Sequence, residues 1–265
     1  MSKTLYALIL GASSGFGKAI SSALAKDGVN IIGVHLDRAS ALKSVEEHIE
    51  NLRGFGVEVY FYNANAADSH KRQMIMDDIE KIFKTKSNPC IKVLVHSLAF
   101  GTLRNFIEDN MENAINQKQL EMTIDVMANS LVYWTQDIIA RKLMISGGKI
   151  FAMTSSGSSK VIHYYGAVSA AKACLESHIR QLAFELGSKG IAVNAILAGV
   201  TDTPALNKIP NAEIIKQNAL RRNPQGRLTT PEDIANFILD NYKRDSHWMT
   251  GSIIHIDGGE SITEL

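Results

Sequence analysis

Residues 5–28 read LYALILGASSGFGKAISSALAKDG, an unbroken apolar run followed by a glycine-rich turn and a helical pattern. Gly11, Gly15 and Gly17 have the spacing G-x-x-x-G-x-G. A turn of this kind lets the backbone approach a pyrophosphate, which the free N–H groups of the helix N-terminus then bind. An ordinary tight strand–helix turn is the alternative, but the strand–turn–helix context favours a nucleotide-binding loop.

The rest of the chain alternates short apolar runs with longer helical patterns, such as 39–52 and 69–83. Unbroken apolar strands separated by helices predict a parallel sheet that is covered on both faces. We therefore expect one α/β domain over residues 1–265, a Rossmann-type doubly wound parallel sheet of about seven strands flanked by helices. The predicted strands are residues 5–10, 29–36, 57–62, 91–96, 149–154, 191–197 and 252–256.

Several element boundaries are marked by capping residues. GSKG at 187–190 predicts the end of a helix over about 165–187. Thr230, Pro231 and Asp233 predict the N-cap and first turn of another helix. The longest segment without a strong pattern covers about 198–229, and we expect it to form a flap over the substrate.

Composition excludes several classes of function. Hydrophobic residues make up 45% of the 265 residues, and 28 Lys and Arg nearly balance 27 Asp and Glu, so neither nucleic acid nor a membrane surface is expected as a partner. No run approaches the roughly 20 apolar residues of a spanning helix, and the N-terminus lacks signal-peptide features. Cys90 and Cys174 lie far apart without metal-ligand spacing. We therefore expect free thiols, no metal site and a cytoplasmic location.

Three further segments join the glycine loop in resembling the short-chain dehydrogenase/reductase family over nearly the whole chain. They are VLVHSLAFG (93–101), AVNAILAGVTDTP (192–204) and IDGG (256–259). The resemblance implies a nicotinamide cofactor, with its adenine near Asn65 and Ala66. The cofactor-binding residues that it implies are Gly11, Ser13, Ser14, Gly15, Phe16, Gly17, His35, Asp37, Arg38, Asn65, Ala66, Ser97, Leu98, Ala99, Lys172, Ala198, Gly199, Val200, Thr201 and Thr203.

The end of the second predicted strand bears on which cofactor is bound. An acidic residue there binds the ribose 2′-OH and repels a 2′-phosphate. The usual position, 24 residues after Gly11, is His35 in this chain. Arg38, helped by His35, could bind a 2′-phosphate through charge-assisted hydrogen bonds, whereas Asp37 could bind the ribose hydroxyls. We expect NADPH, with NADH as the alternative.

The stretch HYYGAVSAAK (163–172) contains the expected catalytic lysine, Lys172. Most members of the family carry Tyr-x-x-x-Lys and a serine thirteen residues before the tyrosine. Here the tyrosine position is Val168, while Ser155 occupies the serine position. The bacterial enoyl-acyl-carrier-protein reductases, a smaller branch, have Tyr-x6-Lys, which Tyr165 and Lys172 match. The resemblance implies Tyr165, Lys172 and Ser155 as catalytic residues, although Ser155 could instead cap backbone groups.

The shifted tyrosine suits a conjugate reduction. If the helix reaches residue 165, Tyr165 lies roughly 10 Å from Lys172 along the axis, against about 6 Å for a residue four positions back. In an enoyl thioester, hydride goes to the β-carbon while negative charge develops on the thioester oxygen. Tyr165 would donate to that oxygen, and Lys172 would fix the cofactor.

Other features agree with this branch or depart from it. HSLAF (96–100) and LAG (197–199) resemble its segments, and Met127 stands where ordinary ketoreductases keep an asparagine. Ser155 stands where the main enoyl-reductase type has a second tyrosine, and Leu10 replaces a usual threonine.

The substrate contacts that we expect are at Phe100, Tyr165 and Leu206, with Phe100 and Leu103 near an acyl pocket. The other methionines and phenylalanines between Phe100 and Met144 are expected mostly in the core. His96 is expected to be a structural hydrogen-bonding residue rather than a proton relay.

The resemblance implies NAD(P)H-dependent reduction of the 2,3 double bond of enoyl thioesters in fatty-acid biosynthesis. The acyl group would be carried on acyl carrier protein or CoA, and Arg221 and Arg222 could contact an acidic carrier. A homotetramer is implied as well. Two alternatives stay open: a carbonyl, 3-oxoacyl or hydroxysteroid-type reductase, and a nucleotide-binding protein without catalysis.

Overall fold

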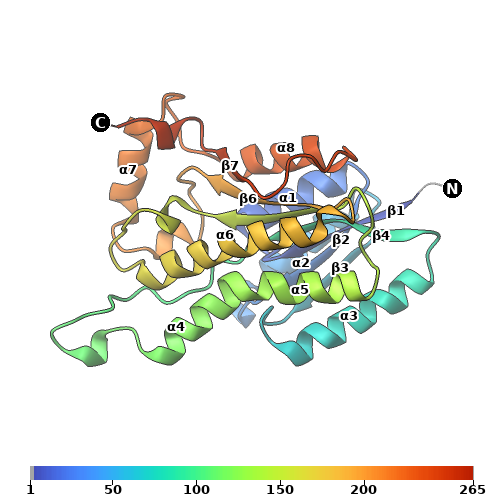
Figure 1. Ribbon diagram of the computed structural model, residues 1–265, viewed down its shortest axis with the longest axis horizontal. Coiled ribbons are helices and arrows are strands. Elements are labelled where there is room, and N and C mark those ends of the chain that lie inside the picture. The colour runs from blue at the N-terminus through green and yellow to red at the C-terminus, as the bar shows by residue number, and fades with distance from the viewer. Residues whose placement is uncertain (1–2, 265) are drawn as a thin grey trace.

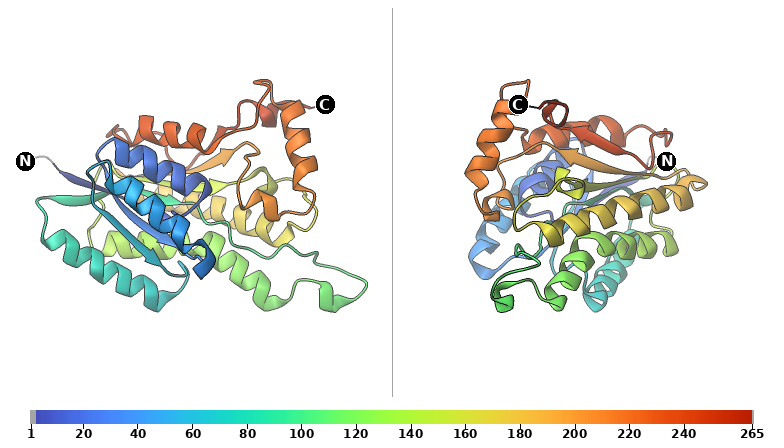
Figure 2. Two further views of the ribbon diagram at one scale, coloured as in Figure 1. Left: turned by 180° about the vertical axis from the view of Figure 1, so that it is seen from behind. Right: turned by 60° about the vertical axis from the view of Figure 1, so that its left-hand side comes forward.

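Seven parallel strands form one sheet in the order β3-β2-β1-β4-β5-β6-β7, with helices on both faces (Figures 1 and 2). The computed structural model describes residues 3–264, so the ends of the predicted domain, residues 1–2 and 265, lie outside the described residues. The predicted Rossmann-type α/β fold is confirmed, and each predicted strand matches an observed one to within two residues at either end.

The strands are β1 (Thr4–Leu10), β2 (Asn30–His35), β3 (Val59–Asn63), β4 (Pro89–His96), β5 (Lys149–Thr154), β6 (Ala192–Ala198) and β7 (Ile253–Ile256). The α-helices are α1 (Gly15–Lys26), α2 (Ala39–Arg53), α3 (Ser69–Lys84), α4 (Gln117–Ile124), α5 (Ser130–Ala140), α6 (Gly166–Gly187), α7 (Ala212–Arg222) and α8 (Pro231–Tyr242). A π-helical turn, Asp125–Asn129, joins α4 to α5.

Alternation along the central strands divides the core into two layers. In β1, Leu8 and Leu10 pack with residues of α3, α5 and α6, whereas Ala7 and Ile9 pack with residues of α1 and α8. All four side chains are fully buried. Successive residues of a strand point to opposite faces, so a strand covered on both faces needs apolar residues at every position.

The order of the strands reverses between β1 and β4. Leu10 at the end of β1 pairs with Val34 of β2 on one side and with His96 of β4 on the other. In open α/β sheets, ligands bind outside the carboxyl ends of the strands at such a switch point. The loops that follow β1, β2, β4, β5 and β6 therefore leave the sheet at the edge where a ligand is expected.

The expected flap, residues 198–229, contains more regular structure than the sequence suggested. It includes a 3-10 turn at Leu206–Lys208 and the helix α7, which stands next to the C-terminal end of the chain (Figure 1). Among the residues of α7 only Ala219 is buried. A helix with so little buried surface shows no clear amphipathic pattern, which explains why it was not predicted.

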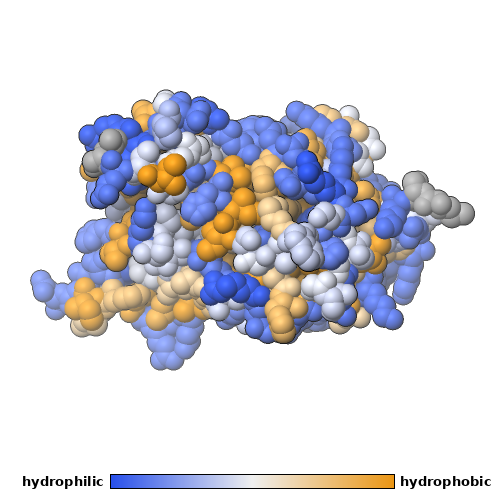
Figure 3. All heavy atoms as spheres, turned by 45° about the horizontal axis from the view of Figure 1, so that its top comes forward, coloured by the Kyte–Doolittle hydropathy of each residue, from blue (hydrophilic) through white to orange (hydrophobic). Residues whose placement is uncertain are grey.

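The segment between β4 and α4 projects from the sheet, and one prediction about it is wrong. Phe106 and Met111, which were expected in the core, are each at least half exposed, although Met127 and Met144 are buried as expected. Apolar atoms are visible at the left end of the face shown in Figure 3, where this segment extends. Phenylalanine and methionine here form an exposed apolar surface rather than core.

The glycine loop generates a stability prediction, because a Cβ on Gly17 would lie 2.0 Å from the Gly11 carbonyl oxygen. We expect Gly17→Ala to lower the free energy of unfolding by about 2 kcal/mol or more, since the backbone itself must shift. Gly187→Ala is the matched control, because a Cβ there meets nothing within 4 Å. It should leave stability unchanged or raise it by up to about 1 kcal/mol. Urea unfolding measures both, and equal stabilities would contradict the expected contact.

Candidate active site

The loop after β1 has the backbone conformation that its glycines allow. Gly11 and Gly15 have φ angles of 89° and 51°, in the left-handed region that glycine adopts without strain. The N–H groups of Gly11 and Ala12 donate to the Val34 carbonyl, which fixes the loop to β2. Ser14 is the N-cap of α1, but its side chain makes no capping hydrogen bond. The first N–H groups of α1 therefore keep the anion-binding capacity of a helix N-terminus.

Two other loops lie directly against the glycine loop. A Cβ on Gly11 would lie 2.4 Å from the Ser97 carbonyl oxygen, after β4. A Cβ on Gly15 would lie 3.6 Å from Cγ2 of Thr203, after β6. The structure thus brings together three segments that the sequence predicted to hold the cofactor. Within these segments, Leu98 packs against the core, whereas Ala99 is exposed.

The end of β2 places its three candidate residues differently. His35 is 5% exposed, and its Nδ1 lies 2.8 Å from a carboxylate oxygen of Asp37. The Asp37 backbone is also held by Asn63, whose side chain both accepts from and donates to it. Arg38 is exposed and precedes α2, and its guanidinium has no hydrogen bond or ion pair to another described residue. Arg38 is therefore the cation at this position that remains accessible to an anionic ligand.

The turn after β3 is shaped by Asn65. Its side-chain oxygen accepts from the Ala67 N–H at 3.0 Å, while the Ala66 carbonyl accepts from the indole N–H of Trp134 at 2.8 Å. Asn65 is exposed and Ala66 is buried. This arrangement positions the turn beside the sheet edge, and the contact of these residues with adenine stays a prediction.

The hydroxyl groups of Ser155 and Tyr165 lie 3.5 Å apart, at the limit of a hydrogen bond. Ser155 follows β5, and its side chain makes no capping bond to the 3-10 turn that it precedes. Tyr165 is the N-cap residue of α6, so the helix reaches almost as far back as the sequence suggested. Burial raises the pKa of Tyr165, and the hydrogen bond with Ser155 opposes this shift. The phenol therefore stays protonated at neutral pH and can donate.

Lys172 is 4% exposed and lies deep at the same edge of the sheet. Its ammonium donates to the Met153 carbonyl at 2.7 Å and to the Leu98 carbonyl at 3.4 Å. Burial lowers the pKa of Lys172 to about 8, while the nearby Glu176 carboxylate raises it. Glu176 is itself held by the Thr154 hydroxyl at 2.6 Å. These contacts fix the ammonium between the ends of β4 and β5.

Apolar residues surround the phenol of Tyr165. Val168 packs with Met127 and Ala171, and the half-buried Leu103 and Tyr165 pack against this cluster. The ring of Phe106 lies close to the start of α6, 2.7 Å from the position of a Cβ on Gly166. Tyr164, with a φ of 62°, packs its ring against that of His163 instead. Tyr165 therefore faces an apolar surface, which suits an acyl chain.

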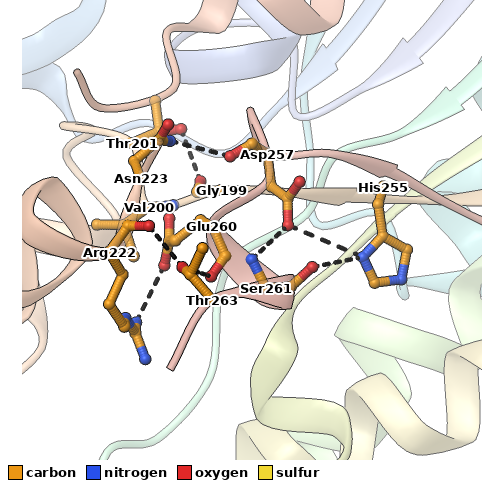
Figure 4. A network of polar contacts seen from close by, with 10 residues as sticks. All are labelled: Gly199, Val200, Thr201, Arg222, Asn223, His255, Asp257, Glu260, Ser261 and Thr263. Atoms are coloured by element: carbon orange, nitrogen blue, oxygen red, sulfur yellow. Dashed lines mark hydrogen bonds and ion pairs between the residues drawn. The ribbon is translucent and has the colours of Figure 1, made fainter. Parts of the chain in front are cut away.

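The base of the flap is fixed by a polar network that sequence reasoning missed (Figure 4). Glu260 accepts from the Val200 N–H at 2.9 Å and pairs with Arg222 at 3.1 Å. Asn223 donates to the Asp257 carbonyl at 3.0 Å. A single glutamate near the C-terminus carries no pattern that could have indicated this role. Arg222, which could contact an acidic carrier, also pairs with Glu260 within the chain, and its contact with a carrier stays a prediction.

Other predicted residues lie on the same loop with local roles. Thr201 donates to the Gly199 carbonyl, and Thr203 accepts from the Leu206 N–H at 3.2 Å. Leu206 is half-buried at the start of its 3-10 turn. The hydroxyl of Thr203 therefore accepts within the turn and can still donate its own hydrogen, and its contact with the cofactor stays a prediction.

No group of three or more His, Cys, Asp or Glu side chains within residues 3–264 has the arrangement of a metal site. Across the same residues, the helices lack the combination of length and apolarity needed to cross a bilayer.

Comparison with known proteins identifies the family. A family model described as Enoyl-(Acyl carrier protein) reductase matches residues 11–261. The 3-oxoacyl-acyl-carrier-protein reductase FabG of Thermotoga maritima is 30% identical over 95% of this chain and 96% of its own. The NADH-dependent enoyl-acyl-carrier-protein reductase FabI of Aquifex aeolicus is 25% identical over 87% of this chain and 82% of its own.

The fold is shared with solved structures as well. The Bacillus cereus enoyl-acyl-carrier-protein reductase, crystallised with NADP+ and an indole naphthyridinone, matches with a TM-score of 0.86 at 23% identity. The match covers 99% of this chain and 98% of that one. The chain therefore belongs to the short-chain dehydrogenase/reductase family, as a nicotinamide-dependent oxidoreductase related to both the enoyl- and the 3-oxoacyl-acyl-carrier-protein reductases.

Proposed function

We propose that this protein reduces the 2,3 double bond of enoyl thioesters with NAD(P)H. The observation that carries the proposal is the position of Tyr165, whose hydroxyl lies next to Ser155 while Val168 occupies the usual tyrosine position. A proton donor displaced toward the start of α6 suits an oxygen that is remote from the reduced carbon. When bound, the nicotinamide supplies the hydride to the β-carbon.

Tyr165 would act on the oxygen of the thioester. Its raised pKa keeps the phenol protonated, so it donates a hydrogen bond as negative charge develops on that oxygen. The hydroxyl of Ser155 can orient the phenol or share the same oxygen. Lys172, whose ammonium is held by the Met153 carbonyl, would bind the cofactor ribose and supply positive charge.

The acyl chain would lie on the apolar surface around Tyr165. Leu103, Met127 and Val168 belong to one packed cluster with Tyr165, and Phe106 covers the start of α6. Phe100 and Leu206, which are half-exposed and half-buried respectively, would close this surface from the projecting segment and from the flap. The acyl group would be carried on acyl carrier protein or CoA.

We also propose a homotetramer. The exposed aromatic residues Phe184 on α6 and Trp248 before β7 are 84% and 91% exposed. Contact with another chain would remove the apolar surface of these two side chains from water.

A 3-oxoacyl reductase is the second candidate function. Ser155, the serine of ketone-reducing family members, lies within reach of Tyr165, and the FabG relative has the higher identity of the two described above. In such an enzyme Tyr165 would protonate the same carbonyl that receives hydride. The two candidates differ in which acyl-CoA is consumed.

Substrate choice and the role of Tyr165 can be tested together by NADPH oxidation. We expect turnover with crotonyl-CoA and little with acetoacetyl-CoA, and we expect Tyr165→Phe to lower kcat on crotonyl-CoA by about 10²- to 10⁴-fold. Tyr164→Phe is the matched control, because its ring packs against His163, and it should stay within about twofold of the unmodified protein. Preference for acetoacetyl-CoA would support the second candidate instead.

We propose NADPH as the preferred cofactor, because Arg38 is exposed beside the loop after β2. Arg38→Ala should raise KM for NADPH roughly 10- to 100-fold, the value of a charge-assisted hydrogen bond to phosphate, and leave KM for NADH within about twofold. Arg53→Ala, at the last residue of α2, removes a surface arginine that pairs with Glu50 and should change neither constant. Equal effects on both cofactors would rule out recognition of the 2′-phosphate by Arg38.

The pKa of Lys172 generates a pH dependence. Because burial lowers this pKa to about 8, the ammonium is charged below that pH and loses its proton as pH rises through it. We expect kcat/KM to fall tenfold per pH unit above about 8. Lys172→Arg keeps its charge at these pH values, so its activity, although lower overall, should show no alkaline decline up to about pH 9.5. The measurement is a pH profile of kcat/KM for both proteins, and an unchanged decline in Lys172→Arg would assign it to another group.

A further inference from the structure

A cavity of about 290 Å³ lies at the edge of the sheet where the strands begin. Its lining comes from the starts of β1 and β4, from the loop before β5 and from the segment that follows α8. The strands are parallel, so this edge is opposite the one that holds the candidate active site. A ligand in the cavity would therefore occupy a place separate from the cofactor.

A bulge in β4 leaves Lys92 outside the strand pairing. Ile91 and Val93 pair with consecutive residues of β1, so Lys92 between them has no partner there. The pairing of β4 with β5 begins only at Val93. Bulges are rare between parallel strands, and they often re-aim a side chain near a functional site. The Lys92 side chain lines the cavity and is only 11% exposed.

The carboxylate of Asp245 shows that an anionic oxygen fits beside Lys92. One of its oxygens lies 2.9 Å from the Lys92 ammonium, although the Asp245 side chain is 88% exposed. A Cβ on Gly147 would lie 2.7 Å from the same oxygen and 3.1 Å from the ammonium nitrogen. Both charged groups therefore lie against backbone that carries no side chain. An ion pair with so exposed a carboxylate contributes little stability, so a competing anion can replace Asp245.

Positive charge exceeds negative charge around this cavity. Lys243 lines it too, but Asp27 pairs with that ammonium at 2.7 Å. Lys149, the first residue of β5, is buried, and its ammonium donates to the Ser246 carbonyl. Lys3 is exposed at the cavity and, like Lys149, forms no ion pair within residues 3–264. Two lysine charges therefore have no carboxylate partner.

The titration of the neighbouring groups agrees with this crowding of charge. Burial first, and the charge of Lys92 second, lower the pKa of Lys149, while Asp245 opposes the shift. The pKa of Asp245 is lowered, by its hydrogen bond and charge interaction with Lys92 first and by Lys3 and Lys149 after them. All three lysines thus act on one carboxylate.

We propose that this cavity binds a phosphate group, whose oxygens accept from Lys92 and Lys3 in place of the Asp245 carboxylate. A phosphate group carries up to two negative charges and three acceptor oxygens, which suits two lysines without carboxylate partners. The cavity is at the small end of the range for ligand pockets, so the ligand is a phosphate ion or a small phosphate ester. This proposal does not depend on the proposed function.

Cys90 gives a local readout because it lines the cavity, whereas Cys174 contacts His178 on α6. Alkylation of each thiol by N-ethylmaleimide can be followed by mass spectrometry, with inorganic phosphate or glycerol 3-phosphate as the added probe. If only the unliganded protein reacts, the rate at Cys90 falls about tenfold at a probe concentration nine times its Kd. The rate at Cys174 should not change, and sodium chloride at the same ionic strength should not protect Cys90. The probe with the lower Kd tells whether the site prefers the ion or the ester.

The two partners of the ion pair should have opposite effects on phosphate binding. We expect Lys92→Gln to raise the Kd for phosphate about tenfold or more, since a charge-assisted hydrogen bond is lost. Asp245→Asn should lower this Kd several-fold, because it removes the competing carboxylate. Lys81→Gln, an exposed position on α3, makes the same change of charge and should leave the Kd within about twofold.

Three results would overturn the proposal: no protection of Cys90 by either probe, equal slowing at Cys90 and Cys174, or equal protection by sodium chloride. Weaker or unchanged phosphate binding in Asp245→Asn would also overturn it, because the ion pair would then only hold the segment after α8 in place. The Asp245→Asn arm does not depend on whether Lys92→Gln folds, since the Asp245 side chain is exposed.

Discussion

The burial of the Lys172 ammonium is the constraint on which the rest of the site depends. A buried charge is costly unless its hydrogen-bonding groups are paired, and here backbone carbonyls at the ends of β4 and β5 supply partners. Parallel strands have their carboxyl ends at the same edge of the sheet, so the Leu98 and Met153 carbonyls lie close together there. Helix α6 brings Lys172 to this edge. The lysine therefore fixes the distance from α6 to the sheet. Once that distance is set, the residue that begins α6 has a defined place relative to the loop after β5, and the approach of Tyr165 to Ser155 follows from it.

Position 168 holds valine where most members of the family have the catalytic tyrosine. Val168 packs with Met127 and Ala171 in one buried cluster, so this part of the site is apolar. The polar function is one turn away, at Tyr165, where burial keeps the phenol protonated. The site therefore has a hydrogen-bond donor, the phenol of Tyr165, at one end and the apolar cluster around Val168 at the other. That arrangement matches a conjugated thioester, in which two carbons separate the reduced β-carbon from the oxygen that gains charge.

The sequence predicted what depends on local pattern and failed where distant side chains meet. The seven strands, their parallel arrangement and the cap at Thr230 are evident from periodicity and capping residues. Helix α7 was missed because almost none of it is buried, and the exposure of Phe106 was missed because hydrophobicity alone does not reveal a projecting segment. The pairing of His96 with Ser130 joins residues 34 positions apart, and no repeat or spacing marks it. The candidate residues themselves came from a family resemblance, while their hydrogen bonds and protonation came only from the folded arrangement.

The network around Glu260 has a consequence for how the flap can move. Both ends of the segment, at Val200 and at Arg222, are fastened to the same carboxylate, which is itself largely buried. Because Val200 and Arg222 are both bound to Glu260, the distance between these two residues is fixed. Movement of the flap would therefore be confined to the residues between them. Motion over the substrate would then be a rotation of α7 as a unit. Glu260, far from Tyr165 and Lys172 in sequence, would be the pivot of that rotation.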